Sequence, residues 1–136
     1  MYKIDKTKKI LIIKKNSVVT KHIRFDGKIL AGMSSSFWGN IEAKDVYLAK
    51  GCLVRGDIIC NRAIIGAYTI FKRIVANDIV LVQSRCIGHE IKAKNIKITR
   101  GAVINIVQAE DSIIIDGISK LKKVNARKII ATESKI

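Results

Sequence analysis

Proline is absent from the 136 residues, cysteine occurs three times, and only 5% of the residues are aromatic. Cys52, Cys60 and Cys86 form no CxxC pair and their number is odd, so the chain fits a reducing cytoplasm better than a secreted disulfide framework. No apolar run approaches the ~18 residues of a membrane span. The longest early run, Ile10 to Ile13, lies between lysines and does not read as a signal peptide. We therefore expect one cytoplasmic domain without an internal linker.

Carboxylates are also scarce. The chain has 11 Asp and Glu against 26 Lys and Arg, which gives a formal net charge of +15. A field of this size attracts polyanions, either nucleic acid or anionic lipid, although lysines also keep an associating protein soluble. Residues 1–22 are expected to form a basic N-terminal tail or first strand, suited to shallow contact with the inner face of the cell membrane. The candidate contacts are Met1, Tyr2, Lys3, Ile4, Lys8 and Lys9.

The usual signatures of catalysis and ligand binding are missing. Neither GxxxxGK[ST] nor GxGxxG occurs, and no zinc-finger spacing is present. His22 and His89 are the only histidines, and neither stands in a ligand cluster with cysteine or carboxylate. His89 follows Arg55 and Lys72 at spacings of 17 residues, which indicates a basic column on one edge. We therefore predict a noncatalytic protein without a cofactor, a bound metal or a small-molecule substrate.

A repeat runs through residues 39–130, with alternating spacings of 17 and 16 residues. Apolar columns at a fixed period are typical of a solenoid, in which each coil stacks on the last. Within each copy, apolar and polar residues alternate, as in strands with one face inward. The columns are Ile41, Ile58, Ile74, Ile91, Val107 and Val124; Ala43, Cys60, Ala76, Ala93, Ala109 and Ala126; Val46, Ala63, Ile79, Ile96, Ser112 and Ile129; and Leu48, Ile65, Leu81, Ile98, Ile114 and Ala131.

Each copy is interpreted as three short strands bent around a small apolar core. Polar residues suit a corner between two of these strands, and that corner column is Asp45, Arg62, Asp78, Asn95, Asp111 and Lys128. We predict an all-β, single-domain parallel β-helix of about six coils of 16–17 residues. It is formed by residues 23–131 and followed by a C-terminal tail at residues 132–136.

The cysteines are interpreted from their columns. Cys60 stands in the alanine column, and Cys86 falls in a fifth column with Leu53, Ile70 and Val103. Both are expected to be small buried hydrophobes. Cys52 is adjacent to the fifth column and is expected nearer the surface.

Two other functions compete. A left-handed β-helix of the hexapeptide acyltransferase family is suggested by local spacings of six, but that family needs eighteen residues per coil and a small residue before each anchor. A nonspecific nucleic-acid binder is suggested by a basic strip that could contact phosphates. That strip consists of Lys92, Lys94, Lys97 and Arg100. Aromatic residues for base stacking are nearly absent from the repeat.

Three short motifs resemble the bactofilins, the polymer-forming cytoskeletal proteins of bacteria and archaea. They are Ile23-Arg24-Phe25-Asp26-Gly27-Lys28-Ile29, Gly39-Asn40-Ile41 and Gly56-Asp57-Ile58, and the likeness covers roughly residues 23–130. The resemblance implies a right-handed, triangular β-helix that associates through like ends into nonpolar filaments without nucleotide. It also implies an N-terminal tail that contacts membrane and a scaffold role. Later coils depart from the Gly-Asp step, at Lys72-Arg73-Ile74, His89-Glu90-Ile91 and Ile106-Val107.

No amphipathic helix is expected to cover either end of the repeat. A solenoid without caps leaves backbone groups and core side chains bare at its ends, which become sites of association. The candidates are Ile23, Phe25 and Ile29 at the N-terminal end, and Val124, Ile129 and Ile130 at the C-terminal end. We therefore predict a homopolymer that stacks end to end.

Overall fold

The computed structural model describes residues 2–132, and the secondary structure in this range is entirely β. The strands are β1 (Tyr2–Asp5), β2 (Ile10–Ile13), β3 (Val18–Val19), β4 (Ile23–Ala31), β5 (Ser36–Phe37), β6 (Ile41–Leu48), β7 (Leu53–Ile65), β8 (Ile70–Val82), β9 (Ile87–Thr99), β10 (Val103–Asp116), β11 (Lys120–Asn125) and β12 (Lys128–Thr132). Except for β1, each strand pairs in parallel with strands of the adjacent coils. The chain is therefore a parallel β-solenoid of about seven turns, which confirms the predicted fold class.

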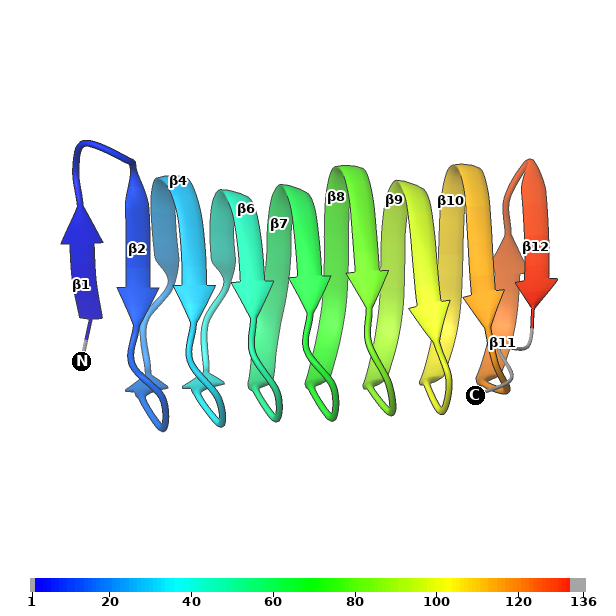
Figure 1. Ribbon diagram of the computed structural model, residues 1–136, viewed down its shortest axis with the longest axis horizontal. Helices are drawn as coiled ribbons and strands as arrows, with labels where there is room; N and C mark the ends of the chain where they lie inside the picture. The colour runs from blue at the N-terminus through cyan, green and yellow to red at the C-terminus, as the bar shows by residue number, and fades with distance from the viewer. Residues whose placement is uncertain (1, 133–136) are drawn as a thin grey trace.

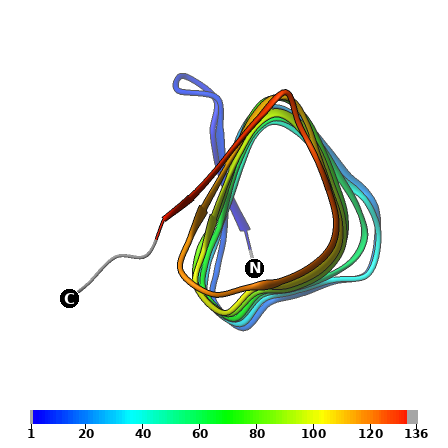
Figure 2. The same ribbon diagram turned by 90° about the vertical axis from the view of Figure 1, so that its right-hand side faces the viewer.

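The coils follow a triangular, right-handed path, and they superimpose closely when viewed along the long axis (Figures 1 and 2). We name the three sides by their place in Figure 1. In the coil of β7, the short face is Leu53–Val54, the back face is residues 58–60, and the front face is residues 62–65. The front face looks toward the viewer in Figure 1, and the short face lies below.

The core is the stack of inward side chains, and its first column matches the sequence pattern. Ile58, Ile74 and Ile91 are in register and completely buried. Branched side chains stacked at the ~4.8 Å spacing of paired strands fill such an interior without gaps. Phe37 and Phe71 are larger core residues in one column, and the Phe71 ring lies where the next coil has Gly88 instead of a side chain.

The third and fourth predicted columns are wrong in two coils. The inward residues are Val80 and Val82, not Ile79 and Leu81, in β8, and Ile113 and Ile115, not Ser112 and Ile114, in β10. These two coils have one extra residue at the corner between the back and front faces, where the register shifts. The predicted corner column therefore has Ile79 in place of Asp78 and Ser112 in place of Asp111.

The solenoid begins earlier than residue 23. β2 pairs in parallel with the front-face part of β4, and β3 pairs with β5, so residues 10–19 supply part of an additional coil. Leu11 is in register with Ile29 and covers it, which leaves Ile29 completely buried. β1 then adds an antiparallel strand along the outer edge of β2.

A column of small buried residues lines the corner that leads into the short face. Ser35, Cys52 and Thr69 in this column are at most 1% exposed, and Cys86 and Ala102 continue it. The preceding backbone is left-handed in most coils, as at Gly51, with φ of 75°. The column corrects two predictions, because Cys52 is buried and Cys86 does not align with Leu53 and Ile70. Ile87 takes that place and points outward, 50% exposed.

Thiol chemistry provides a test of this packing. Burial raises the pKa of the Cys60 thiol to about 12, with a smaller contribution from the Asp45 carboxylate, and burial raises the pKa of Cys86 to about 11. Because the thiolate is the reactive form, at pH 8 only about one Cys60 in ten thousand is ionised. We expect a thiol-specific reagent to leave the native protein unmodified at pH 8 and to label all three cysteines after unfolding in guanidinium. A native thiol that reacts as fast as free cysteine would contradict the packing.

Candidate functional site: the open ends of the solenoid

The C-terminal end of the described solenoid exposes core-column side chains of the kind that the inner coils bury. Ile129 is in register with Ile113 in the core column, yet Ile129 is 49% exposed while Ile113 is 0% exposed. Val124, in register with the buried Val107, is half-buried. β11 and β12 pair only with β10 among the described residues, so their outer backbone edges have no strand partner there. The last described coil therefore offers both an apolar surface and unpaired strand edges.

The N-terminal end is an open apolar cavity of about 350 Å³. It is the mouth of the core, because the first coil has strands on only two of its three faces. The apolar side chains that line it are Tyr2, Ile4, Leu11, Ile13, Val19, Ile23 and Phe25. Covering this apolar cavity with apolar side chains of another molecule is more favourable than leaving it in contact with water.

Four of the six predicted end residues lie at an open end of the described solenoid, and two do not. Ile23 and Phe25 line the N-terminal cavity, and Val124 and Ile129 face the core at the C-terminal end. Ile29 lies one coil inside the N-terminal end. Ile130 is in register with Ile114 and points out from the front face instead of toward the end.

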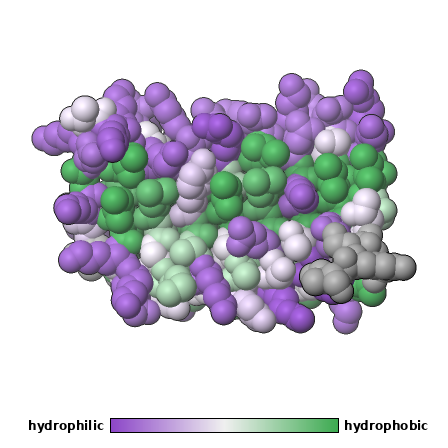
Figure 3. Space-filling model, in the orientation of Figure 1, coloured by the Kyte–Doolittle hydropathy of each residue, from purple (hydrophilic) through white to green (hydrophobic). Residues whose placement is uncertain are grey.

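Ile130 belongs to a stripe that the sequence interpretation assigned to no function. Outward side chains that are mostly apolar follow one another along the front face, and the charged Lys97 interrupts them (Figure 3). In register, the stripe consists of Ile12, Leu30, Tyr47, Ile64, Leu81, Lys97, Ile114 and Ile130. Most of its members are half-buried against their neighbours. Part of it was predicted as core, because Leu81 and Ile114 alternate with equally apolar inward residues.

The predicted membrane contacts lie in the β1–β2 hairpin. Tyr2, Lys3 and Ile4 are in β1, and Tyr2 and Ile4 are 64% and 45% exposed. Lys8 and Lys9 are in the turn between the strands. Met1 lies outside the described residues. The hairpin therefore presents both apolar and basic side chains, but it is an ordered part of the solenoid's N-terminal end.

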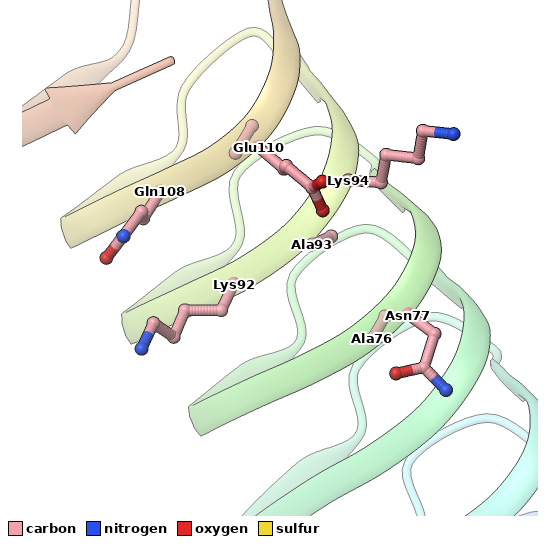
Figure 4. Close-up of a pocket in the computed structure, with 8 residues that line it drawn as sticks. Ala76, Asn77, Lys92, Ala93, Lys94, Gln108 and Glu110 are labelled. Atoms are coloured by element: carbon pink, nitrogen blue, oxygen red, sulfur yellow. The ribbon is translucent and has the colours of Figure 1, made fainter. Parts of the chain in front are cut away.

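The predicted basic strip is divided among different sides of one coil. Lys92 lies on the back face and Lys94 at the corner that follows it, and the two side chains point away from one another (Figure 4), beside a shallow hollow lined by Gln108 and Glu110. Lys97 points out from the front face, in register with Leu81 and Ile114. Arg100 follows at the next corner. The structure does not bring these four side chains together on one face.

Both histidines are surface residues with polar partners. The His22 Nδ1 accepts a hydrogen bond of 2.8 Å from the Asn40 backbone N–H, and the His89 Nδ1 lies 3.0 Å from the Asn105 Nδ2. In the described part of the chain, no three His, Cys, Asp or Glu side chains are arranged to hold a metal ion. Residues 2–132 also contain no helix that could cross a membrane.

These features define a right-handed β-solenoid whose described ends remain open. The right-handed path differs from the left-handed β-helix of the hexapeptide acyltransferases. Comparisons of the chain with the family models, with curated proteins and with solved structures found no match.

Proposed function

We propose that this chain is a self-polymerising structural protein that resembles the bactofilins and forms filaments by end-to-end stacking of its solenoid. The observation that carries the proposal is the exposure of a core column at the C-terminal end, where Ile129 is exposed beside the buried Ile113, together with the open apolar cavity at the N-terminal end. Burial of this surface contributes roughly 25 cal/mol per Å² of apolar area. Pairing of the free strand edges satisfies backbone groups at the same time.

Strand directions support contacts between like ends. In a two-fold junction between like ends, every strand meets an antiparallel partner. β1 already pairs antiparallel with β2, so the N-terminal edge accepts a strand in this orientation. Alternation of N-to-N and C-to-C contacts then gives a nonpolar filament, and no nucleotide is involved in either contact.

We also propose that the filament works in the cytoplasm, along the inner face of the cell membrane, as a scaffold for other proteins. A net charge of +15 attracts the protein to anionic lipid. Nonspecific nucleic-acid binding is the alternative supported by the same charge, and its salt dependence would be steep.

Microscopy of the purified protein tests the proposal. We expect negative-stain images to show unbranched filaments without added nucleotide, because assembly uses only apolar burial and strand pairing. Discrete trimers would favour an acyltransferase architecture, and dispersed monomers at high protein concentration would contradict end-to-end assembly.

A further inference from the structure

The short face differs from the other two faces in charge. Together with the corner that leads into it, the short face is made by residues 15–21, 33–38, 50–55, 67–72, 84–89, 100–105 and 117–122. None of these segments contains Asp or Glu, so all carboxylate side chains of the described residues lie elsewhere. The same segments carry nine exposed basic residues: Lys15, Lys21, Lys50, Arg55, Lys72, Arg85, Arg100, Lys120 and Lys122.

An exposed apolar row runs along the middle of this face. Ile70, Ile87 and Val103 are in register and are 46%, 50% and 42% exposed. Leu53 continues the row, and Ser36 then separates it from Val18, which is 47% exposed. The sequence pattern had placed Leu53, Ile70 and Val103 in a core column, but the inward residues of this face are their neighbours, such as Val54 and Ile104.

Basic side chains flank the apolar row on both sides. Arg55 and Lys72 follow it by two residues in their coils and are succeeded by His89, as the 17-residue spacing predicted. Lys50 and Arg85 lie at the corner on the other side. Ion pairs elsewhere in the described residues, such as Arg62 with Asp45 at 3.0 Å, neutralise basic side chains on the other faces.

Two aromatic side chains stand at the edges of the apolar row. Trp38 is 50% exposed with the Arg55 guanidinium 5.4 Å from its ring centre, and Tyr68 is 52% exposed with the Lys50 ammonium 5.2 Å from its ring centre. Tryptophan and tyrosine next to basic residues favour the boundary between lipid headgroups and acyl chains, because one part of the side chain is apolar and the other polar.

A bilayer fits this combination better than other occupants. Nucleic acid would pair with the basic residues but would leave the branched aliphatic row against phosphates. A second copy of the short face would bring two carboxylate-free basic surfaces together, and each chain already carries +15. In an anionic bilayer, the lipid phosphates can bind the basic residues on both sides of the apolar row. The apolar row itself can then enter the boundary between headgroups and acyl chains, just beneath the phosphates.

We propose that the short face docks on an anionic phospholipid bilayer, with Ile70, Ile87 and Val103 entering the headgroup boundary and the flanking Lys and Arg binding lipid phosphates. This deepens the membrane association proposed above and does not depend on end-to-end assembly. It also assigns membrane contact to the short face instead of the β1–β2 hairpin.

Trp38 is the only tryptophan of the chain, so its fluorescence reports directly on this face. We expect a blue shift of its emission, and quenching by brominated lipid, with mixed phosphatidylglycerol and phosphatidylcholine vesicles but not with phosphatidylcholine alone. Binding through the hairpin or the front face would leave Trp38 in water. An unshifted, unquenched Trp38 in vesicle-bound protein would therefore overturn the proposal.

Matched variants separate the face from total charge. Arg55→Glu with Lys72→Glu is expected to weaken vesicle binding at least about tenfold, since each basic residue near the surface contributes about 1 kcal/mol. Lys94→Glu with Lys97→Glu changes the net charge equally on other faces and is expected to have a much smaller effect. Ile87→Ser tests the apolar row, and Ile59→Ser, with 42% exposure on the back face, is its control.

Each remaining outcome has a defined meaning. Equal weakening by the two charge variants would overturn the proposal, because total charge alone would then explain binding. Loss of binding only with Tyr2→Ser and Ile4→Ser would overturn it in favour of the hairpin. If the wild-type protein does not bind anionic vesicles but forms filaments, the proposed docking of the short face and the proposed membrane association are both wrong. The proposed end-to-end assembly is then unaffected. If the protein binds through Trp38 but forms no filaments, the docking stands and the proposed polymer is wrong.

Discussion

Ile129→Asp is expected to abolish filaments while leaving a folded, β-rich protein. Ile129 is the last member of its core column and is 49% exposed, so the aspartate costs little in the free chain. In a C-to-C junction, however, the carboxylate would be buried against apolar side chains, which costs several kcal/mol without a partner. Negative-stain microscopy and sedimentation measure the outcome.

The adjacent residue provides the control for this variant. Ile130→Asp introduces the same charge in the same strand, but Ile130 points out from the front face and is 36% exposed. We expect this variant to polymerise. If like ends meet, Ile129→Asp should stop assembly at dimers joined by their N-terminal ends, whereas monomers would indicate head-to-tail contacts. Filaments of Ile129→Asp would contradict the assigned interface.

Phe71 and Gly88 are expected to be strongly coupled in stability. A Cβ atom at Gly88 would overlap the ring of Phe71, which is 4% exposed in the adjacent coil. Truncation by Phe71→Ala is expected to cost about 3–5 kcal/mol, because it leaves a cavity. Gly88→Ala is expected to cost about 1–3 kcal/mol by overpacking. The double variant Phe71→Leu with Gly88→Ala should lose less than the sum of the losses of Phe71→Leu alone and Gly88→Ala alone.

Guanidinium unfolding in the Ile129→Asp background measures these free energies without the contribution of polymer. Gly51→Ala is the control, because Gly51 has a φ of 75° and its added Cβ would meet only the Ser34 hydroxyl, at 3.5 Å. Its cost comes from the backbone, so Phe71→Leu should not reduce it. Strict additivity of Phe71→Leu and Gly88→Ala would show that the ring does not occupy the space above Gly88.

The sequence predicted the repeat well and the direction of its side chains less well. The column of Ile58, Ile74 and Ile91 was found because each member begins a back-face segment at a regular interval. At the next corner, one extra residue in the coil of β8 makes Val80 the inward residue instead of Ile79. Because both residues are β-branched, composition alone could not show which of them points inward.

The short face was misread for a related reason. Leu53, Ile70 and Val103 are as apolar as a core column, although they point outward. The small residues just before them, such as Cys52, Thr69 and Ala102, were the available signal, because small side chains fit a tight buried corner. Of the six predicted end residues, four lie at an open end of the described solenoid, and Ile29 lies one coil inside because β2 and β3 precede β4 in the solenoid.

The triangular cross-section has a consequence for a filament of like-end contacts. A two-fold axis perpendicular to the long axis can carry only one of the three sides onto itself, and it exchanges the other two. If the short face is that side, it continues without interruption from one subunit to the next. The front and back faces then alternate along the polymer, so the stripe in Figure 3 is interrupted at every junction. Such a filament is uniform on one side and has a two-subunit repeat on the others, which spaces any protein bound there at every second subunit.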